Sequence, residues 1–259
     1  MITPTKIKQP VPAHERLIFA LDVADLAHAR DLIRQLGDAV SFYKLGLEFF
    51  LSGNYFELAA ELRDQGKKIF ADLKLFDIPA TVAAAVRQLA RHQVDFCTVH
   101  GNDSMLRAAA AAKGNSKILA VTALTSLDQG DLDDLGFRCD AHTLVLSRAR
   151  RALELGCDGV VSSGLEVPAL RAAVDHALIT VCPGIRPIHN DEDDDQQRVV
   201  TPARAIASGA DYLVVGRPIR DAADPRAAAQ AIQAEIRQSR RGSLTLFRDY
   251  LAAVHRIVY

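Results

Sequence analysis

The sequence lacks the features that would direct a protein to nucleic acid, to a membrane or out of the cell. Its 259 residues hold 31 Lys and Arg against 32 Asp and Glu, and a formal net charge of -1 creates no global field for nucleic acid or an anionic membrane. No apolar run approaches the ~20 residues of a membrane span. Residues 1–15, with three prolines and no apolar core, do not resemble a signal peptide, and we expect an irregular extension. Any affinity for phosphate must be local.

Paired cysteines are also missing. The four cysteines are scattered along the chain without a Cys-x-x-Cys pair: Cys97, Cys139, Cys157 and Cys182. This spacing argues against a zinc site and against a dense disulfide framework. We therefore expect no metal centre and a reducing, cytoplasmic location.

The repeated alternation of short apolar runs with helical-period segments predicts the fold. The predicted strands are Leu17–Leu21, Phe42–Leu45, Lys68–Asp72, Asp95–Val99, Ile118–Ala123, Gly159–Ser162, Leu178–Cys182 and Tyr212–Val215. The predicted helices include Leu26–Leu36, Tyr55–Gln65, Ala80–Arg91 and Thr143–Leu155. Strand–helix alternation of this kind favours an α/β fold, a (β/α)8 TIM barrel formed as one domain by residues 1–259. A doubly wound open sheet is the alternative, but its glycine fingerprint is missing from Leu21-Asp22-Val23-Ala24.

Two segments fall outside this alternation. The acidic run Asp191–Asp195 belongs to a loop, Asn190–Gln197, which is either a solvated surface excursion or a lid over a site. At the other end of the chain, residues 240–259 are expected to form a helical extension, with an apolar stripe between Ser243 and Val258.

Polar residues follow every predicted strand, at the end where barrels of this type bind ligands. In chain order they are Asp22, Lys44, Asp72 with Lys74, His100, Thr125-Ser126, Ser162-Ser163, Pro183-Gly184-Ile185-Arg186 and Gly216-Arg217. Because the carboxyl ends of the strands meet at one rim, we expect these side chains to surround a single site.

Some of these residues have a structural explanation as well. Asp22 has two candidate roles: a cap for the helix that follows it, or a residue of the site. An unpaired ammonium on Lys44 would be costly, so Lys44 either forms a salt bridge with Asp72 or Asp22 or joins a catalytic network, and the two roles are compatible. His100 suits a hydrogen-bonded core histidine better than a catalytic base.

The segment from Phe70 to Thr81 places three charges among apolar residues. Asp72 and Lys74 are two apart, so both side chains leave the same face of the sheet if the strand continues through them. Asp77 falls on the turn that follows. Buried charges need partners, so this cluster requires either mutual pairing or a ligand. It is the first candidate for chemistry.

The segments after the last two strands predict a phosphate site. In Gly216-Arg217-Pro218, glycine lets backbone N–H groups approach phosphate oxygens and arginine supplies a planar fork of donors. Arg186, after the seventh strand, adds a second guanidinium at the position where barrels often hold phosphate.

Together these motifs resemble the orotidine 5'-phosphate decarboxylase family, from about Leu17 to Pro225. The resemblance is carried by Asp72-x-Lys74-x-x-Asp77-Ile78-Pro79-x-Thr81, Asp22, Tyr43-Lys44-Leu45-Gly46, Leu124-Thr125-Ser126, Pro183-Gly184-Ile185-Arg186-Pro187 and Gly216-Arg217-Pro218. The first string is highly specific in this context. The loop from His100 to Ser104 departs from the family pattern, which has a small residue and later a Gly-Gly pair there.

The resemblance implies a dimeric barrel that converts orotidine 5'-phosphate to uridine 5'-phosphate and carbon dioxide in pyrimidine biosynthesis, without a metal or an organic cofactor. Lys74 would protonate the pyrimidine carbon that loses its carboxylate, and Asp72 would lie beside that carboxylate. Lys44 and Asp77 would complete a Lys-Asp-Lys-Asp row. Asp77 and Thr81 would reach into the partner subunit's site.

The resemblance also implies the remaining substrate contacts. They are Asp22 and Lys44 at the ribose, Thr125 and Ser126 at the pyrimidine, Ile78 beside Asp77 and Thr81, and Arg186, Gln196, Gly216 and Arg217 at the phosphate. Gln196 is preferred to Gln197 because the family glutamine stands five residues before a Thr-Pro pair, here Thr201-Pro202.

Two other functions compete with this one. A magnesium-dependent sugar-phosphate decarboxylase or aldolase shares the Asp-x-Lys-x-x-Asp pattern, but such relatives carry a glutamate near the place of Lys44, and a lysine there repels a cation. A barrel that binds a nucleotide phosphate without chemistry would keep Gly216 and Arg217 but has no need of Lys74.

Overall fold

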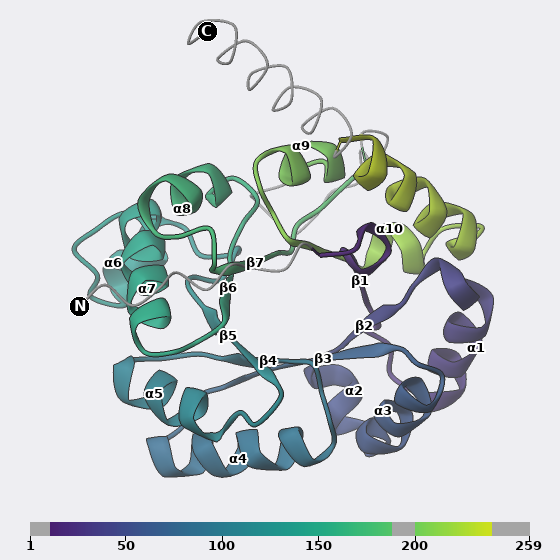
Figure 1. Cartoon of the computed structure of the whole chain (residues 1–259), viewed down its shortest axis with the longest axis horizontal. Coiled ribbons are helices and arrows are strands. Elements are labelled where there is room, and N and C mark those ends of the chain that lie inside the picture. Colours follow the sequence, from purple (N-terminus) through teal and green to yellow (C-terminus); the bar gives the residue numbers. More distant parts are fainter. Residues whose placement is uncertain (1–10, 188–199, 240–259) are drawn as a thin grey trace, which may run out of the picture.

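The computed structural model describes residues 11–187 and 200–239, which form a closed barrel of eight parallel strands surrounded by helices (Figure 1). The strands are β1 (Leu17–Ala20), β2 (Phe42–Leu45), β3 (Lys68–Leu75), β4 (Phe96–Val99), β5 (Lys117–Val121), β6 (Gly159–Val161), β7 (Ile179–Cys182) and β8 (Tyr212–Val215). They pair in sequence order, and β1 closes the ring by pairing with β8 at Leu17↔Leu213. The predicted TIM barrel is confirmed, and the open-sheet alternative is wrong.

The helices lie on the outside of the ring (Figure 1). They are α1 (Leu26–Leu36), α2 (Leu47–Leu51), α3 (Tyr55–Asp64), α4 (Pro79–Arg91), α5 (Asp103–Ala112), α6 (Gln129–Asp134), α7 (Ala141–Glu154), α8 (Val167–Ala173), α9 (Pro202–Ala207) and α10 (Arg217–Arg220). Residues 225–239 are also helical. In the described ranges no helix is long and apolar enough to cross a membrane.

Local chemistry explains where these helices begin and end. The Asp25 carboxylate accepts the His28 N–H at 2.8 Å and caps α1, and Gly37 ends it with a φ of 51° that favours glycine. The cap of α1 is therefore Asp25, so the explanation of Asp22 as a cap is wrong. Pro79 occupies the first turn of α4, as its sequence predicts.

Most predicted boundaries lie within two residues of the observed ones, and β3 differs most. β3 continues three residues beyond Asp72, to Leu75, and β6 ends one residue before Ser162. At the N-terminal end, Val11 is buried and Ala13–Glu15 forms a short 3-10 helix, so the second part of the predicted irregular extension is ordered. Residues 1–10 and the predicted helical extension at 240–259 lie outside the described residues.

The barrel interior is filled at one end by aromatic side chains. Phe42, Phe96 and Tyr212 are the first residues of their strands, and their rings pack edge to face with centroids 4.9 to 5.8 Å apart. Phe70 joins the cluster through Phe96 at 6.0 Å. These rings form an aromatic plug at the amino ends of the strands, which leaves space only towards the carboxyl ends. A second apolar layer lies between the strands and the helices.

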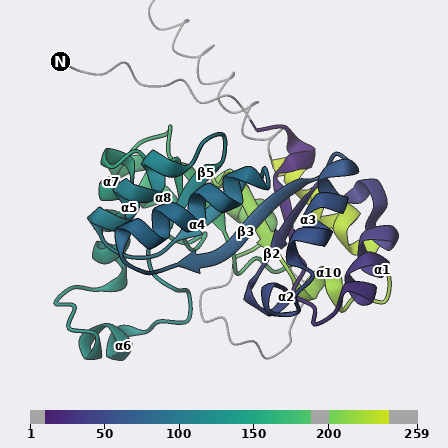
Figure 2. The same cartoon turned by 90° about the horizontal axis from the view of Figure 1, so that it is seen from below.

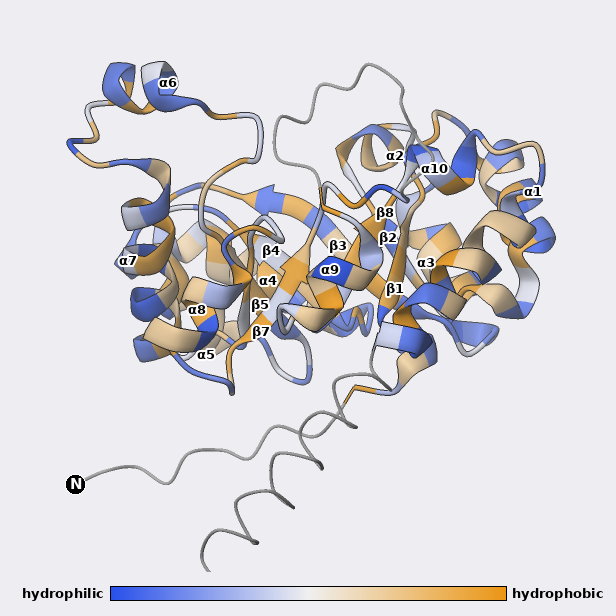
Figure 3. Cartoon of the chain, turned by 90° about the horizontal axis from the view of Figure 1, so that it is seen from above, coloured by the Kyte–Doolittle hydropathy of each residue, from blue (hydrophilic) through white to orange (hydrophobic). Residues whose placement is uncertain are grey.

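The carboxyl ends of the strands form the elaborated face of the molecule. Helices α2 and α10 border this face, and α6 stands apart from the barrel on the same side, at the end of an extended arm (Figures 2 and 3). The strands are mostly apolar, whereas the helices mix polar and apolar residues (Figure 3). The fold thus places a polar, loop-rich mouth above a closed apolar base.

Candidate active site

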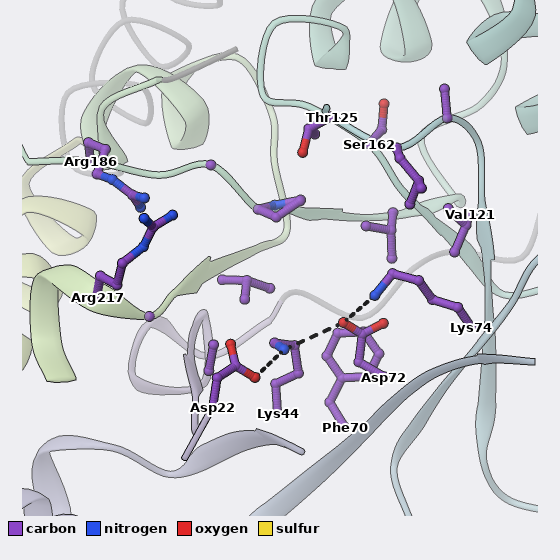
Figure 4. Close-up of a pocket in the computed structure, with 18 of the residues that line it drawn as sticks. Asp22, Lys44, Phe70, Asp72, Lys74, Val121, Thr125, Ser162, Arg186 and Arg217 are labelled. Atoms are coloured by element: carbon purple, nitrogen blue, oxygen red, sulfur yellow. Dashed lines mark hydrogen bonds and ion pairs between the residues drawn. The ribbon is translucent and has the colours of Figure 1, made fainter. Parts of the chain in front are cut away.

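A cavity of about 400 Å³ opens at the carboxyl ends of the strands, above the aromatic plug. Its polar lining residues are Asp22, Lys44, Asp72, Lys74, Thr125, Ser162, Arg186, Arg217 and Arg220, and its apolar lining includes Phe70, Val121, Val161 and Val214. Residues from six of the strands, and from the loop after a seventh, therefore share one site. Figure 4 shows the arrangement, with Lys74 at one end and the two arginines Arg186 and Arg217 at the other.

The charged residues form a continuous row along the floor of this cavity (Figure 4). The Lys44 Nζ lies 2.9 Å from an Asp22 carboxylate oxygen and 3.5 Å from Asp72 Oδ2. The Lys74 Nζ lies 2.9 Å from the same Asp72 oxygen. Asp72 and Lys44 each have only 12% of the side chain exposed, whereas Lys74 has 34% and Asp22 41%. The row is thus buried at its centre and open to the cavity at its ends.

The environment of the row keeps its central members ionised. Burial opposes ionisation of Asp72, but the ammonium groups of Lys44 and Lys74 outweigh it and hold the Asp72 pKa below its ordinary value. Burial likewise opposes the charge on Lys44, and the carboxylates of Asp72 and Asp22 outweigh it and raise the Lys44 pKa. At neutral pH the site therefore presents fixed charges of both signs.

Strand β3 is irregular where it carries these charges. Its pairing with β4 shifts between Ala71↔Cys97 and Leu75↔Val99, and Lys74 has a φ of 46°, in the left-handed region. The predicted convergence of Asp72 and Lys74 is present, but through a bulge rather than through a regular strand. Thr98 of β4 bonds to both residues, accepting the Lys74 N–H at 2.9 Å and donating to Asp72 Oδ1 at 3.0 Å.

Asp77, Ile78 and Thr81 lie away from the cavity of their own chain. All three are exposed, on the turn after β3 and the first turn of α4. The Asp77 carboxylate accepts the N–H of Ile78 at 2.6 Å. The chain by itself therefore does not bring the third predicted charge of the Asp-x-Lys-x-x-Asp string to the row.

The predicted phosphate residues divide between described and undescribed parts of the chain. Arg186, Gly216 and Arg217 line the cavity, and the side chains of the two arginines extend towards each other (Figure 4). The Arg186 guanidinium also donates to the Ile185 carbonyl at 3.1 Å. Gln196, its neighbour Gln197 and the acidic run Asp191–Asp195 lie outside the described residues.

The remaining predicted residues differ in how close they come to the site. Thr125 lines the cavity, whereas its neighbour Ser126 is exposed and is not among the described lining residues. His100 is half-buried and is not among the described lining residues; its ring packs edge to face with that of Phe76, with the ring centroids 5.7 Å apart. Burial, together with the positive charges of Arg148 and Lys74, lowers the His100 pKa, so the ring is neutral at physiological pH.

Two residues of the site were missed from the sequence. Arg220 lines the cavity, donates to the Asp22 carbonyl at 2.9 Å and pairs with Asp221. Arg220 stands one helical turn after Gly216, but the sequence Gly216-Arg217-Pro218 did not indicate that a turn of helix follows. Thr98 had a clearer signal, because period-2 alternation from the inward-facing Phe96 points it into the barrel next to the charges.

Comparison with known proteins gives a consistent result. The profile of the "Orotidine 5'-phosphate decarboxylase / HUMPS family" matches residues 15–232. A protein of Methylococcus capsulatus named orotidine 5'-phosphate decarboxylase is 63% identical over 229 residues, which cover 88% of this chain and 95% of that protein. One of the same name from Xanthomonas campestris is 51% identical, over 88% and 94% of the two chains.

Solved structures agree with the sequence matches. The crystal structure of orotidine 5'-phosphate decarboxylase from Lactobacillus acidophilus superposes with a TM-score of 0.76 at 36% identity, covering 86% of this chain and 99% of that one. The orotidine 5'-phosphate decarboxylase of Pyrococcus horikoshii gives a TM-score of 0.69 at 27% identity, over 85% and 99%. The similarity therefore extends over the whole barrel.

Proposed function

The chain belongs to the orotidine 5'-phosphate decarboxylase / HUMPS family, and from this membership we propose that it converts orotidine 5'-phosphate to uridine 5'-phosphate and carbon dioxide, a step of pyrimidine biosynthesis, with Lys74 as the proton donor. The observation that carries this assignment is the row of Asp22, Lys44, Asp72 and Lys74 on the floor of a cavity whose far end holds two arginines.

The reaction needs an ammonium at one point. Loss of carbon dioxide breaks a carbon–carbon bond and leaves its electron pair on a ring carbon without a neighbouring carbonyl to delocalise it. A fixed positive charge that meets this pair as it develops stabilises the transition state more than the substrate. Lys74 is held by its ion pair with Asp72, and it is exposed enough to reach the ring carbon and transfer its proton there.

Asp72 contributes in two ways. Its carboxylate orients both ammonium groups, because one oxygen contacts Lys74 and Lys44 together. In the proposed complex it also lies beside the carboxylate of the substrate, and this repulsion is relieved when carbon dioxide leaves. Its lowered pKa keeps it charged for that role at neutral pH.

The other cavity residues bind the unreactive parts of the substrate. We assign Asp22 and Lys44 to the ribose, Thr125 and Ser126 to the pyrimidine, and Arg186, Gln196, Gly216 and Arg217 to the phosphate. The separation of the arginines from Lys74 in Figure 4 supports this division, since a nucleotide places its phosphate far from the reacting ring. Binding energy gained at the phosphate then orients the ring against Lys74.

A homodimer completes the site in this proposal, with Asp77, Ile78 and Thr81 entering the cavity of the partner subunit. Two large apolar side chains beside Asp77 support an interface there, since Phe76 and Ile78 are 67% and 64% exposed in the single chain. Surface patches of this kind are typical of subunit contacts. A cytoplasmic location is supported by the four free cysteines.

The position of Lys44 disfavours the magnesium-dependent alternative. Its ammonium lies between the carboxylates of Asp22 and Asp72, in the space that a divalent cation would need. A barrel that only binds a nucleotide phosphate would not need a lysine at position 74, and it would not need to hold that lysine in a strained backbone conformation.

An assay tests the substrate and the reaction together. The purified chain is mixed with orotidine 5'-phosphate, and the loss of orotate absorbance is followed with and without a strong chelator. We expect equal rates in the two conditions. A rate that vanishes with the chelator would reject the metal-free mechanism, and an absence of turnover in both would reject the substrate.

The shared site is tested by mixing two inactive variants, Lys74→Ala and Asp77→Ala. If Asp77 serves the partner subunit, half of the randomly formed dimers contain one intact site, and about a quarter of the wild-type activity returns on mixing. If Asp77 acts within its own chain, mixing restores nothing.

A further inference from the structure

The bulge in β3 is the most unusual backbone feature of the site. Between the register pairs Ala71↔Cys97 and Leu75↔Val99, three residues of β3 lie opposite Thr98 alone. The three residues include Asp72 and Lys74. A bulge of this kind leaves main-chain groups without a ladder partner, and such groups need another bond when they are buried.

The backbone of Lys74 is held in a conformation that a lysine avoids. Its φ of 46° lies in the left-handed region, where a side chain with a Cβ is disfavoured. A strained residue of this type persists only where its surroundings fix it, and such residues gather at functional sites. The surroundings that fix Lys74 are therefore part of how the site works.

Thr98 supplies this fixation with a single hydroxyl group. Its oxygen accepts the N–H of Lys74 at 2.9 Å, and its proton goes to Asp72 Oδ1 at 3.0 Å. Thr98 is fully buried, so no solvent molecule takes over either bond when the hydroxyl is removed. Only a side chain that both accepts and donates satisfies the N–H and the carboxylate together.

We propose that Thr98 is a positioning residue, which locks Lys74 and Asp72 into the geometry for proton transfer without touching the substrate. By occupying Asp72 Oδ1, Thr98 leaves Oδ2 to face both ammonium groups, at 2.9 Å for Lys74 and 3.5 Å for Lys44. The Thr98 side chain is not among the described residues that line the cavity. This inference rests on the proposed function, because it concerns the step that Lys74 performs.

The test compares three variants by steady-state kinetics on orotidine 5'-phosphate. Thr98→Val keeps the shape and removes the hydroxyl, Thr98→Ser keeps the hydroxyl, and Thr122→Val is the matched control. Thr122 is a fully buried threonine beside β5, whose hydroxyl donates to the Val161 carbonyl at 3.0 Å and not to the charged row. All three are checked for folding by thermal unfolding and for binding of uridine 5'-phosphate.

We expect Thr98→Val to lower kcat by about tenfold to a hundredfold, the cost of a small misplacement of reacting groups, with KM changed less than about threefold. Thr98→Ser should recover most of this loss, and Thr122→Val should stay within about twofold of the wild-type kcat, because its bond lies outside the row. If Thr98→Val does not fold, Thr98→Cys, which has a weak donor and acceptor, takes its place and should show a smaller loss of kcat.

A pH profile separates positioning from a general loss of stability. Asp72 is faced by Lys44 from β2, by Lys74 on its own strand and by Thr98 from β4, with Cys97 and Tyr55 near enough for Asp72 to raise their pKa values. Loss of the Thr98 donor raises the pKa of Asp72, so the acid limb of kcat/KM should move to higher pH in Thr98→Val and not in Thr122→Val.

Equal kcat losses in Thr98→Val and Thr122→Val, or a wild-type kcat in Thr98→Val, would overturn the inference. An unmoved acid limb would also do so. These results are distinct from failure of the proposed function, in which the unmodified chain itself does not decarboxylate orotidine 5'-phosphate.

Discussion

The two ends of the barrel use partly or fully buried aspartates in different ways. At the amino ends of the strands, Asp95, Asp158 and Asp211 each precede an even-numbered strand and accept a main-chain N–H from the preceding strand. The donors are Ile69 at 2.8 Å, Ile118 at 2.9 Å and Thr180 at 2.8 Å. At the carboxyl ends, Asp72 faces the ammonium groups of Lys44 and Lys74 and the hydroxyl of Thr98, with a cavity beside it.

At the amino end, the hydrogen-bonding groups around Asp211 have partners within the protein. Its carboxylate receives the Thr180 N–H and pairs with the Arg171 guanidinium at 2.7 Å. Arg171 in turn donates to the carbonyls of Gly209 and Leu178 at 2.8 and 2.7 Å. Charge at this end bonds neighbouring strands to each other, whereas charge at the carboxyl end lines a cavity. Burial of a charge therefore does not by itself indicate function, and what sets Asp72 apart is the open space beside it.

The sharpest way to separate the two ends is to remove Lys74, the proposed proton donor. We expect Lys74→Ala to lower kcat by about 10⁴-fold or more, because both charge stabilisation and proton transfer are lost. Lys117→Ala is the control at the amino end, where the Lys117 ammonium lies 5.8 Å from the Phe96 ring, and its rate should be unchanged. Uridine 5'-phosphate should still bind to Lys74→Ala, as titration calorimetry would show. A normal rate in Lys74→Ala would remove Lys74 from its assigned role.

At the amino end the largest effect should be on stability. Asp211→Asn leaves the buried Arg171 without its counter-charge, and breaking a buried pair in this way costs about 3 to 5 kcal/mol of unfolding free energy. Urea unfolding measures the loss, and the kcat of the folded fraction should match wild type. Asp38→Asn is the surface control, since Asp38 pairs with Arg226 in full contact with water. A large loss of kcat in folded Asp211→Asn would erase the distinction between the two ends.

Arg217 tests the phosphate end of the cavity. Arg217→Ala should weaken substrate binding by about 2 to 5 kcal/mol if the guanidinium pairs with a buried phosphate, while stability stays near wild type. Arg217→Lys retains the charge without the planar fork and should recover only part of the affinity. Inhibition constants for uridine 5'-phosphate and for uridine, which lacks the phosphate, give the comparison. Unchanged affinity for the nucleotide would exclude Arg217 from the site.

The smallest expected effect is on the pH dependence of stability, in which Asp95 and Asp72 should act in opposite directions. Burial raises the pKa of Asp95, so its ionisation opposes folding, and its contribution to stability is lost as pH rises from about 4 through the raised value. The pKa of Asp72 is lowered, so its contribution is present above about 4 and is lost as pH falls through the lowered value.

Asp95→Asn removes a charge that burial opposes and keeps an amide oxygen that accepts the Ile69 N–H. It should therefore stabilise the protein by up to about 1 kcal/mol at pH 7. At pH 3, where the carboxyl group of Asp95 is itself neutral, the substitution should change the stability by nothing. Thermal unfolding of both proteins across this range measures the difference. A gain that is larger at pH 3 than at pH 7 would contradict the assignment.

The sequence predicts those parts of the molecule that depend on the local pattern of apolar and polar residues. The eight strands follow from short apolar runs, and the polar residues that end them meet at one rim because a barrel leaves them no other place. The bulge at Lys74 and the bonds of Thr98 could not be derived in this way, since they depend on the register between two strands. Arg220 was missed for a similar reason, because its contact with Asp22 joins residues 198 positions apart.

The aromatic plug makes the cavity a dead end. Phe42, Phe96 and Tyr212 close the barrel below Phe70, so the mouth through which the nucleotide enters is also the way out for the gas that the reaction releases. Carbon dioxide has to pass the bound nucleotide, or wait until it departs. In the proposed mechanism, protonation of the ring carbon by Lys74 therefore competes with the return of carbon dioxide that is still in the cavity, and the faster the ammonium transfers its proton, the more often the reaction goes forward.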